Sequence, residues 1–274
     1  MNKVALITGA ARRKGLGQAI AARLASDSYD ILLHDRGATE GDIAPAHGVG
    51  VNQDLDTTAQ EIRDATGQRV ETVTGDLLDD TAITNIVAAA DAYFGRLDIL
   101  VNNAGVGYLF GLLTETDPAH LDAVLGVNLR APMLLTGQAA NMMIRGGIGG
   151  RVVNIASQAS KSGFAFASAY TASKHGLLGF TRSAALELGK HGITVNAVCP
   201  NHVTTGLGAW QNEYMSKARG ETLDKYMAGM RARIPLGRTG LPEDTANAVA
   251  FLCSEQASYV TGEAMNVSGG EEYH

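Results

Sequence analysis

The sequence predicts an α/β fold in a single domain, with a doubly wound parallel sheet of about seven strands flanked by helices. Short apolar runs alternate with helical patterns along the chain, which is typical of βαβ units. Glycine is abundant, at 33 residues, as tight turns between strands and helices require. No repeat, linker or break in composition divides the 274 residues, so one domain over residues 1–274 is expected.

Each predicted strand is a short apolar run beside turn-forming residues. These runs are Val4–Thr8, Asp30–His34, Val70–Thr74, Ile99–Asn102, Arg151–Ile155, Thr194–Val198 and Ala264–Val267. The predicted helices carry apolar residues at helical spacing, over Gly17–Ala25, Thr58–Ala65, Asp80–Phe94, Pro118–Met143, Tyr170–Lys190 and Pro242–Cys253. Start signals precede two of these helices, namely Thr116 and Asp117 before Pro118, and Leu241 before Pro242.

Two connections are longer than the others. Residues 37–57 form a link rich in Gly, Ala and Asp, which is longer than a βα connection needs. Residues 201–234 form an excursion that contains Trp210, Tyr214, Tyr226 and several Met. Long loops in compact α/β domains are usually functional or mobile, so the second connection is a candidate for substrate binding.

The composition excludes several classes of protein. A formal net charge of −6 argues against nucleic acid or an anionic membrane as the main partner. Cys199 and Cys253 lie in apolar surroundings without CxxC spacing, which predicts buried free thiols and no metal site. The first strand follows the N-terminus without a leader, and no apolar run approaches the length of a membrane span. We therefore expect a cytoplasmic protein.

Tyr170 and Lys174 are the first candidate catalytic pair. They are four residues apart in a predicted helix, so their side chains share one face. An unperturbed phenol has a pKa of about 10, and a neighbouring ammonium favours the phenolate and lowers that pKa. The pair is therefore a candidate general acid/base for a hydroxyl proton. On its own, a Tyr-x-x-x-Lys pair is more often part of a solvated helix face.

A glycine-rich turn, Gly9-Ala10-Ala11-Arg12-Arg13-Lys14-Gly15-Leu16-Gly17, joins the first strand to the first helix. Such a turn allows backbone N–H groups to approach a phosphate at the start of a helix. The spacing differs from G-x-G-x-x-G, and a simple tight turn is the alternative. Its place after the first strand favours a dinucleotide site in a Rossmann-type fold, with Gly9, Gly15, Leu16 and Gly17 as candidate contacts.

Asp35, at the end of the second strand, is the candidate determinant of cofactor preference. A carboxylate there can accept hydrogen bonds from the adenosine ribose and repel a 2′-phosphate, which favours NAD. Arg36 and the three cations of the turn could instead bind that phosphate, so NADP stays open. We expect NAD, because an acid beside a dianion is costly.

Several further motifs follow in order along the chain: Asp76 in Thr74-Gly75-Asp76-Leu77, Asn102-Asn103-Ala104-Gly105, Asn128 in Val127-Asn128-Leu129, Ser157 in Asn154-Ile155-Ala156-Ser157, and Tyr170-x-x-x-Lys174. Each could be structural when taken alone. Together with the glycine turn, they resemble a classical short-chain dehydrogenase/reductase over essentially the whole chain. The long excursion and the C-terminal part are closest in character to the sugar and polyol dehydrogenases of that family.

The resemblance implies a role for each motif. Tyr170 would exchange the substrate proton, Lys174 would lower the pKa of Tyr170 and bind the nicotinamide ribose, Ser157 would hold the substrate oxygen, and Asn128 would hold a water beside Lys174. Hydride would pass to or from the nicotinamide. The implied cofactor contacts are Asp76 and Leu77 at the adenine, Asn102, Ala104 and Gly105 on the adenosine side, and Pro200, Val203 and Thr205 along the nicotinamide.

The chain departs from the family pattern at two places. Five residues separate Gly9 from Gly15 where similar proteins have three, which enlarges the turn. The Pro-Gly that usually follows the sixth strand is Pro200-Asn201 here, and Asn tolerates a positive φ better than most residues. Asn201 is also expected to place a polar side chain near the nicotinamide.

Loops over the carboxyl ends of the strands should select the substrate. The expected contributors are residues 107–112, residues 158–166 and the 201–234 excursion, which we expect to form a helical lid. Its mixture of Trp210, Tyr214 and polar residues suits a sugar, polyol or similar small polar molecule, with Trp210 as a candidate contact beside Ser157 and Tyr170. One alternative is a 3-oxoacyl thioester reductase that uses NADPH, and another is a non-catalytic dinucleotide-sensing regulator.

The two longest predicted helices, Pro118–Met143 and Tyr170–Lys190, carry more apolar residues than one buried face requires. In similar proteins these helices pair across a two-fold axis, which implies a homotetramer. The terminal residues 269–274 are expected to reach a neighbour's site.

Overall fold

The computed structural model describes residues 2–37, 52–107 and 111–272. Within these residues seven strands form one sheet, in the order β3-β2-β1-β4-β5-β6-β7, and every neighbouring pair is parallel. The predicted doubly wound α/β fold is confirmed. Among the helices of the described residues, none has the length and apolar character that a membrane crossing requires.

The strands are β1 Val4–Thr8, β2 Asp30–Asp35, β3 Val70–Thr74, β4 Ile99–Asn102, β5 Gly150–Ile155, β6 Ile193–Pro200 and β7 Ala264–Val267. The α-helices are α1 Leu16–Ser26, α2 Asn52–Thr66, α3 Asp80–Phe94, α4 Pro118–Leu125, α5 Ala131–Gly146, α6 Ser168–Leu188, α7 Gly206–Ala218, α8 Leu223–Arg233 and α9 Pro242–Cys253. A π-helical segment, Gly126–Arg130, joins α4 to α5.

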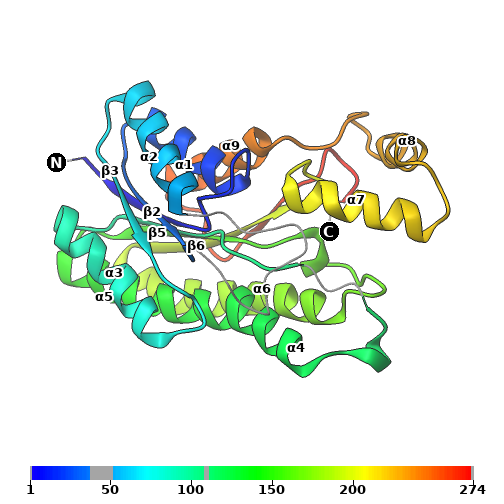
Figure 1. The fold of residues 1–274 in the computed structure, drawn as a ribbon. Helices are drawn as coiled ribbons and strands as arrows, with labels where there is room; N and C mark the ends of the chain where they lie inside the picture. Colours follow the sequence, from blue (N-terminus) through cyan, green and yellow to red (C-terminus); the bar gives the residue numbers. More distant parts are fainter. Residues whose placement is uncertain (1, 38–51, 108–110, 273–274) are drawn as a thin grey trace.

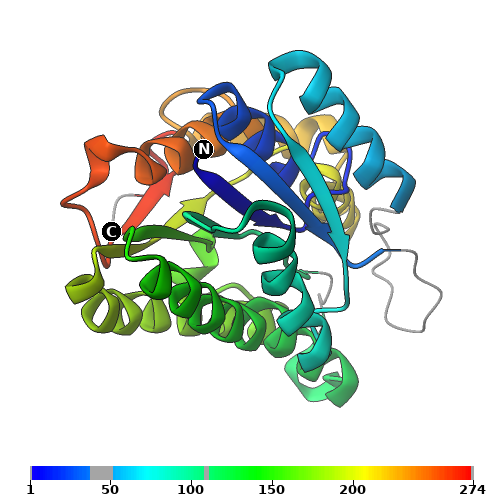
Figure 2. The same cartoon turned by 90° about the vertical axis from the view of Figure 1, so that its left-hand side faces the viewer.

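The helices form a layer on each face of the sheet (Figures 1 and 2). Helices α1, α2 and α9 cover one face, and α3, α5 and α6 cover the other. The strands supply both cores, because alternate side chains point to opposite faces. In β2, for example, Ile31 and Leu33 pack under α1, whereas Leu32 packs toward α3 and α5. Helices α7 and α8 stand beyond the carboxyl ends of the strands, at the right of Figure 1.

Two helices differ clearly from the sequence-based expectation. The predicted helix Pro118–Met143 is interrupted at its middle by the π-helical segment. Helix α2 begins at Asn52, so the end of the predicted 37–57 connection is helical, while residues 38–51 lie outside the described residues. Leu55, in the first turn of α2, is buried, and the polar residues around it in the sequence hide the helical pattern. The expected helical character of residues 201–234 is confirmed by α7 and α8.

A buried chain of amides ties the sheet to the two longest helices. Asn102 Nδ2 on β4 donates to Asn154 Oδ1 on β5 at 2.8 Å and to Thr136 Oγ1 on α5 at 3.1 Å. Asn154 Nδ2 donates to Thr181 Oγ1 on α6 at 2.9 Å. All four side chains are buried, so each hydrogen bond satisfies groups that water does not reach.

We predict that Asn154→Ala lowers the free energy of unfolding by about 2–4 kcal/mol, because it leaves the amide of Asn102 buried with one partner fewer. Urea denaturation followed by circular dichroism measures the change. Asn85→Ala, at an exposed position of α3, is the control and should change stability by less than about 0.5 kcal/mol. Equal stability of the two variants would contradict the role of the network.

Candidate active site

The turn between β1 and α1 is a cradle that only glycine can form. Gly9 has a φ of +70°, and a Cβ added there would lie 2.7 Å from Ala104 Cα. A Cβ on Gly17 would lie 2.3 Å from the carbonyl oxygen of Gly9. Gly15 occupies the N-cap of α1, and no side chain caps this helix end. The backbone N–H groups at the start of α1 therefore suit a phosphate group.

Asn103 holds this cradle in place. Its side-chain Nδ2 donates to the carbonyl oxygens of Thr8 at 2.8 Å and Gly9 at 2.9 Å. In return, Thr8 Oγ1 accepts from the backbone N–H groups of Asn103 at 3.1 Å and Ala104 at 3.0 Å. The sequence analysis named Asn103 only as part of a motif. Its position directly after a strand that neighbours β1 was the available signal.

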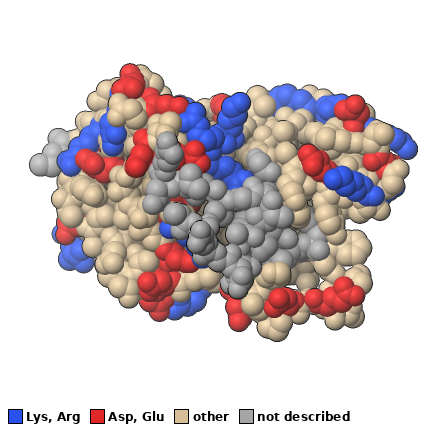
Figure 3. Space-filling model, viewed as in Figure 1, with Lys and Arg blue, Asp and Glu red and all other residues tan. Residues whose placement is uncertain are grey.

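Asp35 and Asp76 lie at the ends of β2 and β3, as predicted. Asp35 Oδ2 accepts from the backbone N–H of Ala11 at 2.8 Å, which joins this carboxylate to the glycine turn. Asp76 Oδ2 forms an ion pair with Arg36 Nε at 2.9 Å. Among the cations of the enlarged turn, Arg13 pairs with Glu61 at 2.8 Å. Figure 3 shows Lys and Arg side chains gathered between α2 and α7.

Two predicted cofactor contacts have side chains that point elsewhere. The side chain of Asn102 is buried in the amide chain between the strands and α5. The side chain of Leu77 is buried in the core under α3 and α5. Both residues sit at the expected edge of the sheet, but their side chains serve the packing of the domain, so only their backbone groups can serve a ligand there.

Ser157, Tyr170 and Lys174 come together at the carboxyl end of β5. Lys174 Nζ lies 5.7 Å from the centroid of the Tyr170 ring and donates to the carbonyl oxygen of Ile155 at 2.7 Å. Burial raises the pKa of Tyr170, and a hydrogen bond between the Ser157 hydroxyl and the phenol opposes that rise. Ser157 Oγ also accepts from the backbone N–H of Ala159 at 3.1 Å, which orients the hydroxyl.

Burial dominates the electrostatics of this cluster. It raises the pKa of Tyr170, and it lowers the pKa of Lys174 to about 8. Desolvation is the largest influence on Tyr170, so its pKa is raised overall, and the lowering of that pKa by Lys174 stays a prediction. Proximity in sequence gave no measure of how deeply the phenol is buried.

Asn128 belongs to the π-helical segment and is buried. Its Nδ2 donates to the carbonyl oxygen of Val106 at 2.8 Å, and its Oδ1 accepts from the N–H of the same residue at 2.8 Å. Asn128 Nδ2 also donates to Ser173 Oγ at 3.2 Å, so both hydrogens of the side-chain amide are used. A Cβ on Gly105 would lie 3.4 Å from Asn128 Oδ1 and 3.8 Å from Lys174 Nζ, so all three residues border one space.

The residues after β6 lead into the N-terminus of α7. Pro200 ends the strand, Val203 pairs with Gly240, and Thr205 is the N-cap of α7. The positive φ expected at Asn201 is found one residue later, at His202, with a value of +42°. Asn201 is buried and its Nδ2 donates to Glu271 Oε2 at 2.6 Å, a partner that the sequence analysis did not anticipate.

Trp210 and Tyr214 stack on α7, with ring centroids 5.6 Å apart. Of the other expected substrate loops, residues 158–166 continue from Ser157, whereas Tyr108, Leu109 and Phe110 lie outside the described residues. The thiols Cys199 and Cys253 are free and buried, as predicted. Cys199 lies near Ser157 and Lys174; burial raises its pKa, and the charges of Lys161 and Lys174 oppose that rise.

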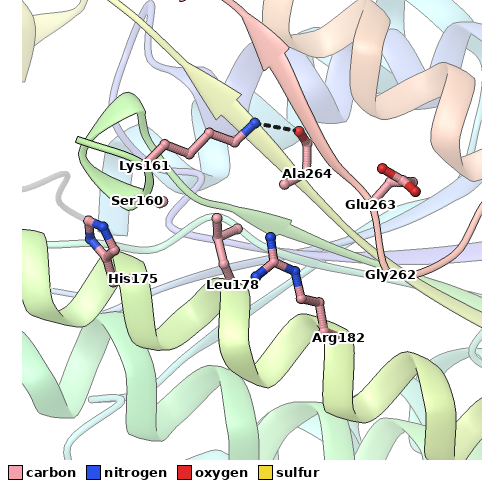
Figure 4. A pocket seen from close by; sticks show the side chains of 8 residues that line it. All are labelled: Ser160, Lys161, His175, Leu178, Arg182, Gly262, Glu263 and Ala264. Carbon is pink, nitrogen blue, oxygen red and sulfur yellow. Dashed lines mark hydrogen bonds between the residues drawn. The ribbon is translucent and has the colours of Figure 1, made fainter. Parts of the chain in front are cut away.

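A cavity of about 560 Å³ lies between α6 and β7 (Figure 4). His175, Leu178 and Arg182 of α6 point toward it, and Lys161 Nζ donates across it to the carbonyl oxygen of Ala264 at 2.8 Å. Ser160 and Lys161 of the expected substrate loop 158–166 line this cavity, whereas none of the candidate catalytic or cofactor-binding residues does.

Comparisons with known proteins agree with this geometry. A family model described as "Enoyl-(Acyl carrier protein) reductase" matches residues 9–272. Galactitol 2-dehydrogenase of Agrobacterium fabrum is 35% identical over 98% of this chain and 97% of its own length. The 3-oxoacyl-(acyl-carrier-protein) reductase of Aquifex aeolicus is 37% identical over 98% of this chain and 96% of its own length.

Among solved structures, carveol dehydrogenase from Mycobacterium avium in complex with NAD matches with a TM-score of 0.91 and 31% identity, over 98% of this chain and 97% of that chain. The sequence matches span almost the full length of both partners, and the motifs converge at one edge of the sheet. The chain therefore belongs to the short-chain dehydrogenase/reductase family, whose members are oxidoreductases of alcohol and ketone groups that use NAD(P).

Proposed function

We propose that this oxidoreductase interconverts a secondary alcohol and a ketone on a sugar, a polyol or a similar small polar molecule, with NAD as its cofactor. The observation that carries the proposal is the convergence of Ser157, Tyr170 and Lys174 at the end of β5, beside the glycine cradle after β1. The cofactor, when bound, supplies or accepts the hydride.

Tyr170, Ser157 and Lys174 each have a separate role in the proton transfer. Tyr170 gives its phenol proton to the substrate oxygen during ketone reduction and accepts it back during alcohol oxidation. Ser157 donates a hydrogen bond to the same oxygen, where negative charge develops. Lys174 uses one N–H on Ile155 and keeps two for the nicotinamide ribose, while its charge stabilises the phenolate that forms.

Asn128 fits the role of a water-holding group. After its bonds to Val106 and Ser173, one lone pair of Oδ1 remains, and this oxygen borders the space at Gly105 that Lys174 also borders. A water there would connect Lys174 to solvent. The backbone of the glycine turn, together with Asp76, Leu77, Ala104 and Gly105, would hold the adenosine half of the cofactor.

The charges near β2 support NAD over NADP. The carboxylate of Asp35 faces the turn and accepts from the N–H of Ala11. Arg36 and Arg13 have acidic partners, Asp76 and Glu61, and the charge of Arg12 interacts with that of Asp35. A 2′-phosphate would meet the charge of Asp35 and would have to displace these ion pairs. The ribose hydroxyls of NAD require neither change.

The lid supports a small polar substrate. The stacked pair of Trp210 and Tyr214 offers a flat apolar surface, and polar side chains surround it along α7. We propose that Trp210 contacts the substrate and that residues 201–234 close over it. The similarity to galactitol 2-dehydrogenase agrees with this class. The similarity to the Aquifex reductase favours a second candidate, reduction of a 3-oxoacyl thioester.

We also propose a homotetramer. Large apolar side chains are exposed on the faces that the family uses for pairing: Met133 on α5 is 46% exposed and Leu186 on α6 is 86% exposed. Tyr259, in the segment that precedes β7, is fully exposed. Surfaces of this kind are typical of contacts between subunits.

Tyr170→Phe should lower kcat by about 10³-fold or more while the Kd for NADH changes less than about twofold, because the ring packing is kept and only the proton is lost. Steady-state kinetics and NADH fluorescence titration measure the two quantities. The matched control is Tyr259→Phe at a solvent-exposed position, and it should behave as the wild type. A Tyr170→Phe enzyme with full turnover would refute the mechanism.

Ketone reduction should slow as the pH rises through about 8, because Lys174 has a pKa of about 8 and loses its charge above that pH. Tyr170 keeps its proton over the same range, since burial raises its pKa. The measurement is kcat/KM for the ketone against pH. Lys174→Arg stays charged, so its profile should lack this descending limb at whatever activity remains. The same limb in both enzymes would assign it to another group.

The kcat/KM for NAD should exceed that for NADP by at least about tenfold, since repulsion of a 2′-phosphate by Asp35 is worth at least about 1.4 kcal/mol. Asp35→Asn keeps an acceptor for Ala11 and removes the charge, so the ratio should fall at least about tenfold. Asp27→Asn, beside Arg23 at the end of α1, is the control and should leave the ratio unchanged. A wild type that prefers NADP would contradict the assignment.

A substrate panel tests the proposed class. We expect measurable oxidation of galactitol, another hexitol or 2,3-butanediol with NAD, at a kcat/KM at least about tenfold above that for reduction of a 3-oxoacyl thioester with NADPH. The reverse order would support the second candidate. Tight NADH binding with no turnover on any substrate would instead support the dinucleotide-sensing regulator.

A further inference from the structure

The C-terminal segment, residues 268–272, folds back onto the end of α8. Gly269 and Gly270 have positive φ values of +64° and +94°. A Cβ on Gly269 would lie 2.7 Å from Ile234 Cγ2, and one on Gly270 would lie 3.0 Å from Pro235 Cγ. The N–H of Leu236 donates to the carbonyl oxygen of Gly269 at 3.1 Å. The described part of the tail therefore packs against its own chain, and the expected reach of residues 269–274 to a neighbour's site stays a prediction.

Glu271 is the residue through which the tail reaches the site. Its Oε2 accepts from Asn201 Nδ2 at 2.6 Å and lies 3.3 Å from His202 Nε2. Its Oε1 accepts from Arg233 Nε at 3.2 Å. The side chain is only 13% exposed, so these contacts are partly shielded from water. One carboxylate thus joins the loop after β6 to the last residue of α8.

The backbone of the loop after β6 needs such an external contact. His202 adopts a φ of +42°, a left-handed conformation that costs free energy in residues other than glycine, although His adopts it more often than most. The neighbouring side chains of Asn201 and His202 both point to the carboxylate of Glu271. Their contacts with the tail hold the turn in a conformation that the local sequence does not prefer.

The next residue, Glu272, makes a second connection. Its backbone oxygen accepts from Ser268 Oγ at 2.9 Å and from Asn266 Nδ2 at 3.2 Å, which closes the tail into a compact turn. Its carboxylate accepts from the side chain of Gln158, the residue after Ser157. The tail is therefore held from both sides, and Glu271 is presented at a defined position.

We propose that Glu271 is a positioning residue that fixes the loop after β6 against the end of α8, and so places both the nicotinamide contacts and the lid. The inference rests on the proposed function, because it takes Pro200, Val203 and Thr205 as nicotinamide contacts and residues 201–234 as the lid. Glu271 acts through Asn201, His202 and Arg233 and touches neither substrate nor cofactor. The carboxylate suits this task because its oxygens accept from donors on two separate segments at once.

Trp210 gives a direct readout of the lid, since it is the only tryptophan of the chain and lies on α7. The experiment compares wild type, Glu271→Gln, Arg233→Gln and the double variant by acrylamide quenching of Trp210 without cofactor, and by NADH titration. Each single variant should raise the quenching constant by about twofold and the Kd for NADH by about fivefold to tenfold. The double variant should be no worse than the poorer single one, because both changes remove the same contact.

The matched control is Glu255→Gln, which removes a carboxylate that pairs with Lys3 at 2.6 Å and Arg151 at 3.4 Å. It should leave both readouts at wild-type values. Wild-type quenching and NADH binding in Glu271→Gln, or fully additive effects in the double variant, would overturn the proposal. A wild type that fails to bind NADH would refute the proposed function alone, because the quenching comparison needs no cofactor.

Discussion

The hydrogen bond from Lys174 Nζ to the carbonyl oxygen of Ile155 is the interaction on which the candidate active site depends. It joins α6 to the end of β5 at 2.7 Å, in a buried position. Seven residues further along the same helix, Thr181 accepts from the side chain of Asn154, the strand residue next to Ile155. Two attachments about two turns apart fix the rotation of the helix. Tyr170, one turn before Lys174, is thereby held at the carboxyl edge of the sheet.

The burial of this hydrogen bond and of the side chains around it sets the pKa values of Lys174 and Tyr170. Burial lowers the pKa of Lys174 to about 8 and raises the pKa of Tyr170. Each group is thus held nearer to its neutral form than solvent would hold it, and charge on either one must be stabilised by a partner. The two pKa values, 10.0 and 10.5 in the free side chains, therefore move apart, so that Lys174 loses its proton before Tyr170 as the pH rises and Tyr170 keeps its proton near neutral pH.

Features that a short stretch of sequence determines could be predicted, whereas features that depend on packing between distant segments could not. The strands, the glycine cradle and the Tyr170–Lys174 pair follow from short patterns, and the structure places them as expected. The direction in which Asn102 points, the π-helical segment at Asn128 and the pKa of Tyr170 depend on packing between distant segments, which no local pattern contains. The same reason hid Glu271, whose partners lie 38 and 70 residues away.

The two halves of the proposed site, for adenosine and for nicotinamide with substrate, depend on these two different kinds of contact. The proposed adenosine half is built from strand ends and from Asn103, whose hydrogen bonds to Thr8 and Gly9 join neighbouring strands of the sheet. The proposed nicotinamide and substrate half depends on the loop after β6, α8 and the tail, which meet through side chains such as that of Glu271 and through isolated backbone hydrogen bonds such as that from Leu236 to Gly269. Substitutions in the second half can alter the lid without disturbing the sheet. Relatives with this fold are named for substrates as different as galactitol and acyl thioesters. This is possible because the residues that select the substrate lie in loops whose conformation the sheet does not determine.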